Sequence, residues 1–224
     1  MIRALVFDFD GLIIDSEAAI YQSWQELYTE YGYELPVEDW LLTIGTAENY
    51  FDPWRHLEQL IGRAVDWGAV NPRRRARERE LVMAQPVLPG VEAYLMEARR
   101  LGLKTGLASS SSCEWVTGHL ERLGLLGYFD CLQARDDVPR TKPDPALYRS
   151  VLEIFQVRGE EAIAFEDSLH GILAARAAGM HCVAVPNALT RRLSMQHASL
   201  RLDSLAELSL ARLLEIAADW NSAG

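Results

Sequence analysis

The fold of this chain can be inferred from its first residues, where Ile-Arg-Ala-Leu-Val-Phe-Asp-Phe occupies positions 2–9 and Asp10-Gly11 follow. Residues 2–9 form a short apolar run of β-type side chains, which is typical of a buried strand. A strand this apolar cannot stand alone, so it predicts a sheet that is completed by strands from later in the chain. Asp8 and Asp10 fall at the end of this first strand.

An alternation of strand-like and helix-like segments begins after residue 86. Helix-like segments stop at glycines such as Gly102 and Gly179, and glycine often terminates helices. Asp144-Pro145 indicates an N-cap followed by proline at the first helical position. The alternation predicts an α/β fold, a Rossmann-like, doubly wound parallel sheet with helices on both faces. The predicted strands are residues 104–108, 131–134, 162–165 and 182–185, and the predicted helices are residues 91–101, 114–123, 146–155 and 168–178.

Residues 16–86 carry no convincing strand pattern, and their apolar residues recur at helical spacing. We therefore predict that this segment is a helical cap domain, inserted after the first strand into an α/β core made of residues 1–15 and 87–224. A run of arginines at positions 73–79 is expected to form a solvated helix face. The apolar positions at helical spacing include Ile20, Trp24, Leu27, Tyr28 and Tyr31.

The composition argues against several classes of partner. The chain has 224 residues and a formal net charge of −10, whereas nucleic acid and anionic membranes favour basic surfaces. A small phosphorylated metabolite remains compatible, because a metal ion and one or two cations can reverse the sign of the potential inside a pocket. The apolar runs are far shorter than the ~20 residues that span a bilayer. We expect neither nucleic acid nor a membrane as a partner.

The cellular setting is predicted from the N-terminus and the cysteines. The N-terminal apolar segment is interrupted by Asp8 and lacks a small-residue cleavage site, so no signal peptide is predicted. Cys113, Cys131 and Cys182 are odd in number and form no C-x-x-C pair, which favours reduced structural thiols. We expect a cytoplasmic protein and, by default, a monomer.

Polar residues follow several of the predicted strands. Asp8 and Asp10 end the first strand, and four serines at positions 109–112 follow the second. Glu166-Asp167 follows the fourth strand, and Lys142 lies between the third and the fourth. Ligands of open α/β sheets bind outside the carboxyl ends of the strands. We therefore expect these side chains to converge at one edge of the sheet.

The carboxylates in this set predict a metal ion. Asp8 and Asp10 are two residues apart, so on a regular strand they would share a face and repel each other. Glu166 and Asp167 are expected at the same edge. Clustered carboxylate oxygens suit Mg²⁺, which keeps water ligands that a phosphate can replace.

Four motifs of this chain resemble, in order and spacing, the signatures of the haloacid dehalogenase superfamily. The resemblance extends over nearly the whole chain. The helical insertion is similar to that of superfamily members with a cap between the first two signatures, including the β-phosphoglucomutase-like phosphatases. The motifs are Phe7-Asp8-Phe9-Asp10-Gly11 followed by Asp15-Ser16-Glu17; Ala108-Ser109; Lys142-Pro143-Asp144-Pro145; and Phe165-Glu166-Asp167-Ser168 with Gly171 and Ala175.

The resemblance implies a Mg²⁺-dependent phosphatase that acts on a small phosphate monoester through an aspartyl-phosphate. Asp8 would be the nucleophile, and Asp10 would be the general acid and then the general base. The implied catalytic residues are Asp8, Asp10 and Lys142; the implied phosphate-binding residues are Ser109, Ser110 and Lys142; and the implied Mg²⁺ ligands are Asp8, the backbone carbonyl of Asp10, Asp167 and Glu166, the last directly or through water. Ser111 and Glu114 have the spacing of a capping box.

Several other reactions of the superfamily are disfavoured by the sequence. Its dehalogenases need no acid to protonate an alcohol, because halide leaves unaided, so Asp10 argues against dehalogenation. Its phosphonate-cleaving members use a lysine of the cap, and residues 16–86 contain no lysine.

Two alternatives remain open. One is a sugar phosphomutase of the β-phosphoglucomutase type, although the positions of its cap histidine and arginine hold Ile20 and Glu48 here. The other is a non-catalytic, phosphate-binding regulatory module. Asp8 and Asp10 together argue against a module, because binding alone does not need a nucleophile. No cap residue indicates the physiological substrate.

Overall fold

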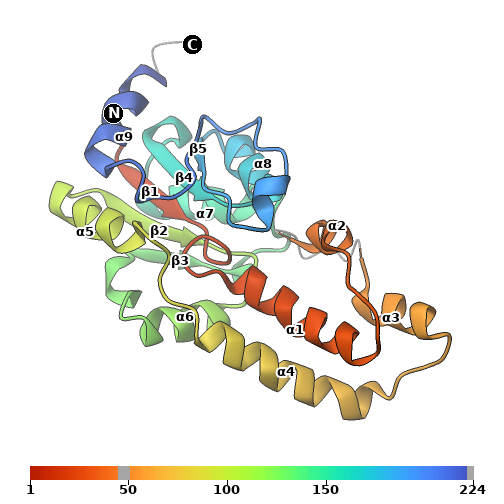
Figure 1. Cartoon of the computed structure of the whole chain (residues 1–224). Coiled ribbons are helices and arrows are strands. Elements are labelled where there is room, and N and C mark those ends of the chain that lie inside the picture. Colours follow the sequence, from red (N-terminus) through yellow and green to blue (C-terminus); the bar gives the residue numbers. More distant parts are fainter. Residues whose placement is uncertain (45–50, 221–224) are drawn as a thin grey trace.

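The computed structural model describes residues 1–44 and 51–220 of the chain. Within these residues, six strands form one parallel sheet in the order β3-β2-β1-β4-β5-β6, with β1 paired to β2 and β4 (Figure 1). The predicted α/β, Rossmann-like fold is thereby confirmed. The strands are β1 (Ala4–Phe7), β2 (Lys104–Ala108), β3 (Cys131–Gln133), β4 (Ala162–Glu166), β5 (His181–Ala184) and β6 (Leu200–Arg201).

Helices cover both faces of this sheet. Along β1, Leu5 and Phe7 belong to one buried apolar cluster, whereas Ala4 and Val6 belong to a second one on the opposite face. Side chains of α5, α6 and α9 contribute to the first cluster, and those of α7 and α8 contribute to the second. The sheet is therefore doubly wound, as predicted. These helices are α5 (Val91–Leu101), α6 (Cys113–Arg122), α7 (Ala146–Phe155), α8 (Leu169–Ala177) and α9 (Leu210–Trp220).

The helices that the structure describes between β1 and α5 have an apolar cluster of their own, built around Trp24 and Tyr28. α1 and α4 lie side by side (Figure 1). Leu189 and Leu193, from the loop after β5, pack against this cluster. A separate cluster is what a helical cap requires, and the division into cap and core stays a prediction. The helices are α1 (Ser16–Glu30), α2 (Val37–Trp40), α3 (Pro53–Ile61) and α4 (Trp67–Met83).

The arginine run on α4 is not wholly solvated, which corrects one prediction. Arg74 is buried, and its guanidinium lies 4.3 Å from the centroid of the Trp24 ring. Arg73, by contrast, is exposed and forms an ion pair with Glu30 of α1. A run of like charges does not reveal which member faces a neighbouring helix, and the packing of α4 on α1 decides it.

The predicted strands and helices between residues 87 and 186 lie within one residue of the observed ones. α7 begins at Ala146 as predicted, but its cap residue is Pro145 rather than Asp144, whose Oδ1 accepts a hydrogen bond from Ala146 N at 3.0 Å. β6 and α9 were not predicted. β6 has two residues, too few for a periodic pattern, and the alternation used for the prediction ends before α9.

No helix within residues 1–44 and 51–220 combines the length and the apolar character that crossing a membrane requires. Cys113, Cys131 and Cys182 are free thiols.

Candidate active site

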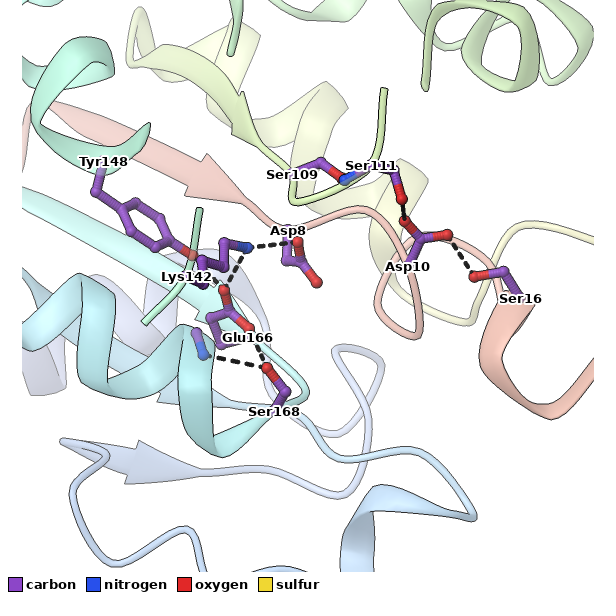
Figure 2. A network of polar contacts seen from close by, with 10 residues as sticks. Asp8, Asp10, Ser16, Ser109, Ser111, Lys142, Tyr148, Glu166 and Ser168 are labelled. Carbon is purple, nitrogen blue, oxygen red and sulfur yellow. Dashed lines mark hydrogen bonds and ion pairs between the residues drawn. The ribbon is translucent and has the colours of Figure 1, made fainter. Parts of the chain in front are cut away.

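The carboxyl ends of β1, β2 and β4 surround a cavity of about 260 Å³, a size that suits a small molecule. The side chains of Asp8, Lys142 and Glu166 point toward one another (Figure 2). The convergence that parallel strands predict is therefore observed. The residues lining the cavity are Asp8, Asp10, Glu17, Thr43, Ser109, Ser110, Ser111, Arg135, Lys142, Asp167 and Ser168.

Asp8 directly follows β1 and has a buried side chain, and its backbone N–H donates to Phe165 O of β4 at 3.0 Å. Lys142 Nζ donates to Asp8 Oδ1 at 2.5 Å (Figure 2). Burial raises the pKa of the Asp8 carboxyl to about 7, even though Lys142 acts in the opposite direction and Glu166 adds to the increase. The negative charge of an ionised Asp8 is therefore only partly compensated in the protein alone.

Lys142 is held between two carboxylates. Its Nζ lies 2.6 Å from Glu166 Oε1, and Tyr148 Oη donates to the same oxygen at 2.5 Å. Ser168 Oγ donates to Glu166 Oε2 at 3.3 Å (Figure 2). Burial by itself would lower the pKa of the Lys142 amine, but Asp8 and Glu166 outweigh it and raise that pKa. Lys142 therefore stays charged, and both oxygens of Glu166 already accept hydrogen bonds.

Asp10 points away from the Lys142 cluster, toward α1 and the serine loop (Figure 2). Ser16 Oγ donates to Asp10 Oδ1 and Ser111 Oγ donates to Oδ2, each at 2.6 Å. Trp115 Nε1 also donates to Oδ1, at 3.0 Å. The predicted capping box of Ser111 is wrong, because its hydroxyl binds Asp10. Ser112 is the N-cap of α6 instead.

Asp167 is buried beside Asn187, whose Nδ2 donates to Asp167 Oδ2 at 2.9 Å. Burial and the neighbouring Asp8 and Glu166 raise the pKa of Asp167 well above its usual range. Gly11 passes so close that a Cβ there would lie 2.2 Å from Asp167 Oδ2, and its φ is +79°. Glycine is therefore required at this position for space as well as for the turn.

The serine loop after β2 presents two hydroxyls of different character. Ser109 is buried, and its Oγ accepts a hydrogen bond from Ser111 N at 3.0 Å. Ser110 Oγ is buried and has no hydrogen-bond partner among the described residues. A buried hydroxyl without a partner is costly, so this atom is suited to a ligand in the cavity.

Several residues around the site were not predicted from the sequence, among them Asn187, Arg135 and Trp115. Asn187 follows the fifth predicted strand, so its place at a strand end could have identified it. Arg135, in the loop after β3, lines the cavity for the same topological reason. Trp115 could not have been found this way, since its contact with Asp10 depends on how α6 packs.

A metal ion fits the carboxylates that the structure brings together. Oxygens of Asp8, Glu166 and Asp167 lie within 4.8 Å of one another, and all three residues are buried. When ionised, these three carboxylates and the one ammonium of Lys142 leave two uncompensated negative charges, a balance that a divalent cation restores. Oxygen-only donors of this kind suit Mg²⁺. The side chain of Asp10 is not part of this cluster.

Ile20 and Glu48 are the two cap positions that bear on the mutase alternative. Ile20 is partly buried and packs against apolar clusters, where it offers no hydrogen-bonding group. Glu48 lies outside the described residues.

Comparisons with known proteins find a family and relatives that match most of this chain. The sequence matches the family described as haloacid dehalogenase-like hydrolase over residues 5–185. It is 46% identical over 215 residues to YhcW of Bacillus subtilis (strain 168), which is named as a phosphatase, and the match covers 96% of this chain and 97% of that protein. It is 30% identical over 189 residues to the fructose-1-phosphate phosphatase YqaB of Escherichia coli (strain K12), covering 81% of this chain and 95% of that protein.

Solved structures extend the likeness to three dimensions. CbbY from Rhodobacter sphaeroides in complex with phosphate aligns with a TM-score of 0.72 at 29% identity, covering 95% of this chain and 99% of that one. A variant of CbbY in complex with xylulose-(1,5)bisphosphate aligns with a TM-score of 0.71 at 28% identity, with the same coverage of both chains. Because the family match extends from β1 to the end of β5 and includes all four motifs, this chain belongs to the haloacid dehalogenase-like hydrolase family.

Proposed function

We propose that this chain is a Mg²⁺-dependent phosphatase that hydrolyses a small phosphate monoester, of the sugar-phosphate class, through an aspartyl-phosphate on Asp8. The observation that carries the proposal is the buried Asp8 carboxylate, which lines the cavity with Lys142 Nζ at 2.5 Å. Ser109 and Asp167 line the same cavity. A carboxylate with a positive charge and hydrogen-bond donors beside it is equipped for nucleophilic attack on phosphorus.

In the first step, an Asp8 carboxylate oxygen bonds to phosphorus while the bond from phosphorus to the leaving oxygen breaks. Asp10 gives its proton to that oxygen, so an alcohol departs. In the second step, Asp10 takes a proton from water, the water oxygen bonds to phosphorus, and the bond to Asp8 breaks. Inorganic phosphate leaves, and both aspartates return to their starting states.

The remaining residues neutralise and orient charge, which is most of the catalytic work in phosphoryl transfer. Lys142 places its ammonium between Asp8 and the phosphoryl oxygens, and Ser109 and Ser110 donate hydrogen bonds to them. Mg²⁺, when bound, would neutralise the carboxylates and the phosphate. Asp8, Asp167 and the backbone carbonyl of Asp10 would hold it, and Glu166, whose oxygens are engaged by Lys142, Tyr148 and Ser168, would act through water or by fixing Lys142.

The substrate class, the cellular location and the oligomeric state are inferred from less direct observations. YqaB is named for a sugar phosphate, and CbbY has been solved with a sugar bisphosphate and with phosphate. A cavity of about 260 Å³ suits a substrate of that scale. The free thiols and the acidic charge support a cytoplasmic protein, which we take to be a monomer.

Release of phosphate from p-nitrophenyl phosphate, with Mg²⁺ and with a chelator, tests the reaction class. We expect turnover that needs Mg²⁺ and is lost in Asp8→Asn. A silent wild type that does not differ from this variant would instead favour a non-catalytic, phosphate-binding module.

A panel of phosphorylated metabolites then tests the substrate class, with sugar phosphates expected to be the preferred substrates. The same plate should include sugar phosphates with a bisphosphate activator. Isomerised sugar phosphate, formed without free phosphate, would replace the phosphatase proposal by the mutase alternative.

A further inference from the structure

Three donors hold the carboxylate of Asp10, and one of them differs in kind from the other two. Ser16 and Ser111 contribute hydroxyls, whereas Trp115 contributes the indole N–H at 3.0 Å from Oδ1. A hydroxyl can donate or accept a hydrogen bond, but an indole N–H can only donate. The indole therefore cannot accept a proton held on Asp10.

This difference determines which oxygen of Asp10 can present a proton. Oδ1 faces the Trp115 N–H, which can only donate. In the neutral acid, Oδ1 is therefore the unprotonated, carbonyl-like oxygen. Oδ2 is held only by the Ser111 hydroxyl among the described residues, and that hydroxyl can rotate to accept instead. The proton of a neutral Asp10 thus belongs on Oδ2.

Neighbouring aromatic rings and a backbone hydrogen bond hold the Trp115 ring in place beside Asp10. It packs edge-on against His119, with ring centroids 4.5 Å apart, and His119 in turn lies 6.0 Å from the ring of Phe9. Phe9 is the residue between Asp8 and Asp10, so the indole is anchored to the loop whose carboxylate it binds. Ser112 Oγ accepts a hydrogen bond from Trp115 N at 3.3 Å and secures the backbone at the start of α6.

We propose that Trp115 is a positioning residue for Asp10: its indole N–H holds Oδ1 as an acceptor and thereby directs the proton on Oδ2 to the leaving oxygen of the substrate. The proton passes from Oδ2 to that oxygen as its bond to phosphorus breaks, and Asp10 is left as a carboxylate. The inference rests on the proposed function, in which Asp10 is the general acid.

The test uses two substrates that differ in their need for an acid. p-Nitrophenolate departs without a proton, whereas the alkoxide of benzyl phosphate must be protonated as it leaves. Trp115→Phe keeps an aromatic ring beside His119 and removes the N–H. We expect kcat/KM for benzyl phosphate to fall about 10-fold in Trp115→Phe, as part of the 10²–10⁴-fold that a general acid contributes, and kcat/KM for p-nitrophenyl phosphate to change less than about 2-fold.

A matched control is Trp67→Phe, which removes the indole hydrogen bond to Glu58 Oε1 at 2.9 Å, among the helices of the predicted cap. It should affect the two substrates equally. If Trp115→Phe folds poorly in thermal melts, replacing the indole by benzothiophene through an unnatural amino acid keeps the shape and still removes the N–H.

The outcomes separate the two proposals. Wild-type protein inactive on both substrates with Mg²⁺ overturns the proposed function itself. An active wild type in which Asp10→Asn loses benzyl phosphate selectively, while Trp115→Phe loses both substrates equally or neither, overturns only the role of Trp115. Selective loss in both variants supports it.

Discussion

Among the described residues, buried charged side chains occur in two regions, which differ in how far opposite charges balance. At the carboxyl edge of the sheet, buried Asp8, Glu166 and Asp167 lie close together, and Lys142 forms ion pairs with Asp8 and Glu166. Between α1 and α4, buried Arg74 has its charge matched by Glu78 and lies over the Trp24 ring. The first region has an excess of negative charge, whereas the second is balanced.

The difference separates charge that serves binding from charge that serves packing. An uncompensated buried carboxylate destabilises the folded state until a partner arrives, as the raised pKa values of Asp8 and Asp167 indicate. A matched buried ion needs no further partner, and removing one member destabilises the fold. Substitutions in the two regions should therefore change activity and stability in opposite ways.

The largest effect is expected at the centre of the unbalanced region. Asp8→Asn should reduce phosphatase activity at least about 10³-fold, because no nucleophile remains. Its melting temperature should be unchanged or higher, since a strained buried charge is gone. Initial rates with p-nitrophenyl phosphate and thermal melts measure the two effects, with exposed Asp203→Asn as the control. Activity within about 10-fold of wild type would contradict the nucleophile assignment.

Asp167→Asn should be more stable than the wild type without metal and less stable than the wild type with saturating Mg²⁺. Saturating Mg²⁺, at about 100 times its dissociation constant, should stabilise the wild type by about 2.7 kcal/mol. Without metal, the variant should be the more stable of the two, because Asp8 loses a repelling neighbour while Asn187 keeps an acceptor. Thermal melts in chelator and in Mg²⁺ would show the crossing. Equal stabilisation of both proteins by Mg²⁺ would remove Asp167 from the proposed ligands.

The unbalanced region was the more predictable one from the sequence. In a parallel sheet, a polar residue at a strand end is carried to a known edge, so the sequence positions of Asp8 and Asp167 were enough to place these two residues together. Lys142 lies in the loop before α7, and its position between the third and fourth predicted strands indicated the same edge. Contacts that arise from helix packing gave no such signal. Tyr148 holds Glu166 from α7, and Trp115 reaches Asp10 from α6.

The balanced region shows why the remainder could not be predicted. Arg73 and Arg74 are adjacent and chemically identical in the sequence, yet 6% of the Arg74 side chain is exposed compared with 65% of the Arg73 side chain. The face that α4 turns to α1 separates them, and charge patterning cannot supply it. The two-residue β6 was missed because its pairing with β5, rather than a pattern of its own, defines it.

The two arginines offer a matched pair of substitutions in the balanced region. Arg74→Met should lower the free energy of unfolding by about 2 kcal/mol, because it removes the contact with Trp24 and leaves Glu78 without its cation. Arg73→Met should cost less than about 1 kcal/mol, as exposed ion pairs usually do. Urea denaturation measures both. Equal losses would mean that burial does not distinguish the two arginines.

A separate prediction, for the pH dependence of stability, concerns Glu17, which lies at the start of α1 and in the cavity wall. Burial, with Asp10 and Asp8 nearby, raises the pKa of the Glu17 carboxyl from 4.5 to about 8. Between these two values the unfolded chain has lost a proton that the folded chain retains. Unfolding then releases a proton, so stability falls as the pH rises from about 4.5 to about 8.

Glu17→Gln removes this group, so the melting temperature of the variant relative to wild type should rise steadily from pH 5 to pH 8. Melts in chelator keep metal binding out of the comparison. A relative melting temperature that stays constant with pH would show that Glu17 ionises in the folded protein as it does in the unfolded chain. The excess of negative charge at the sheet edge would then end before α1, and Asp8 and Asp10 would not influence the first helix of the predicted cap.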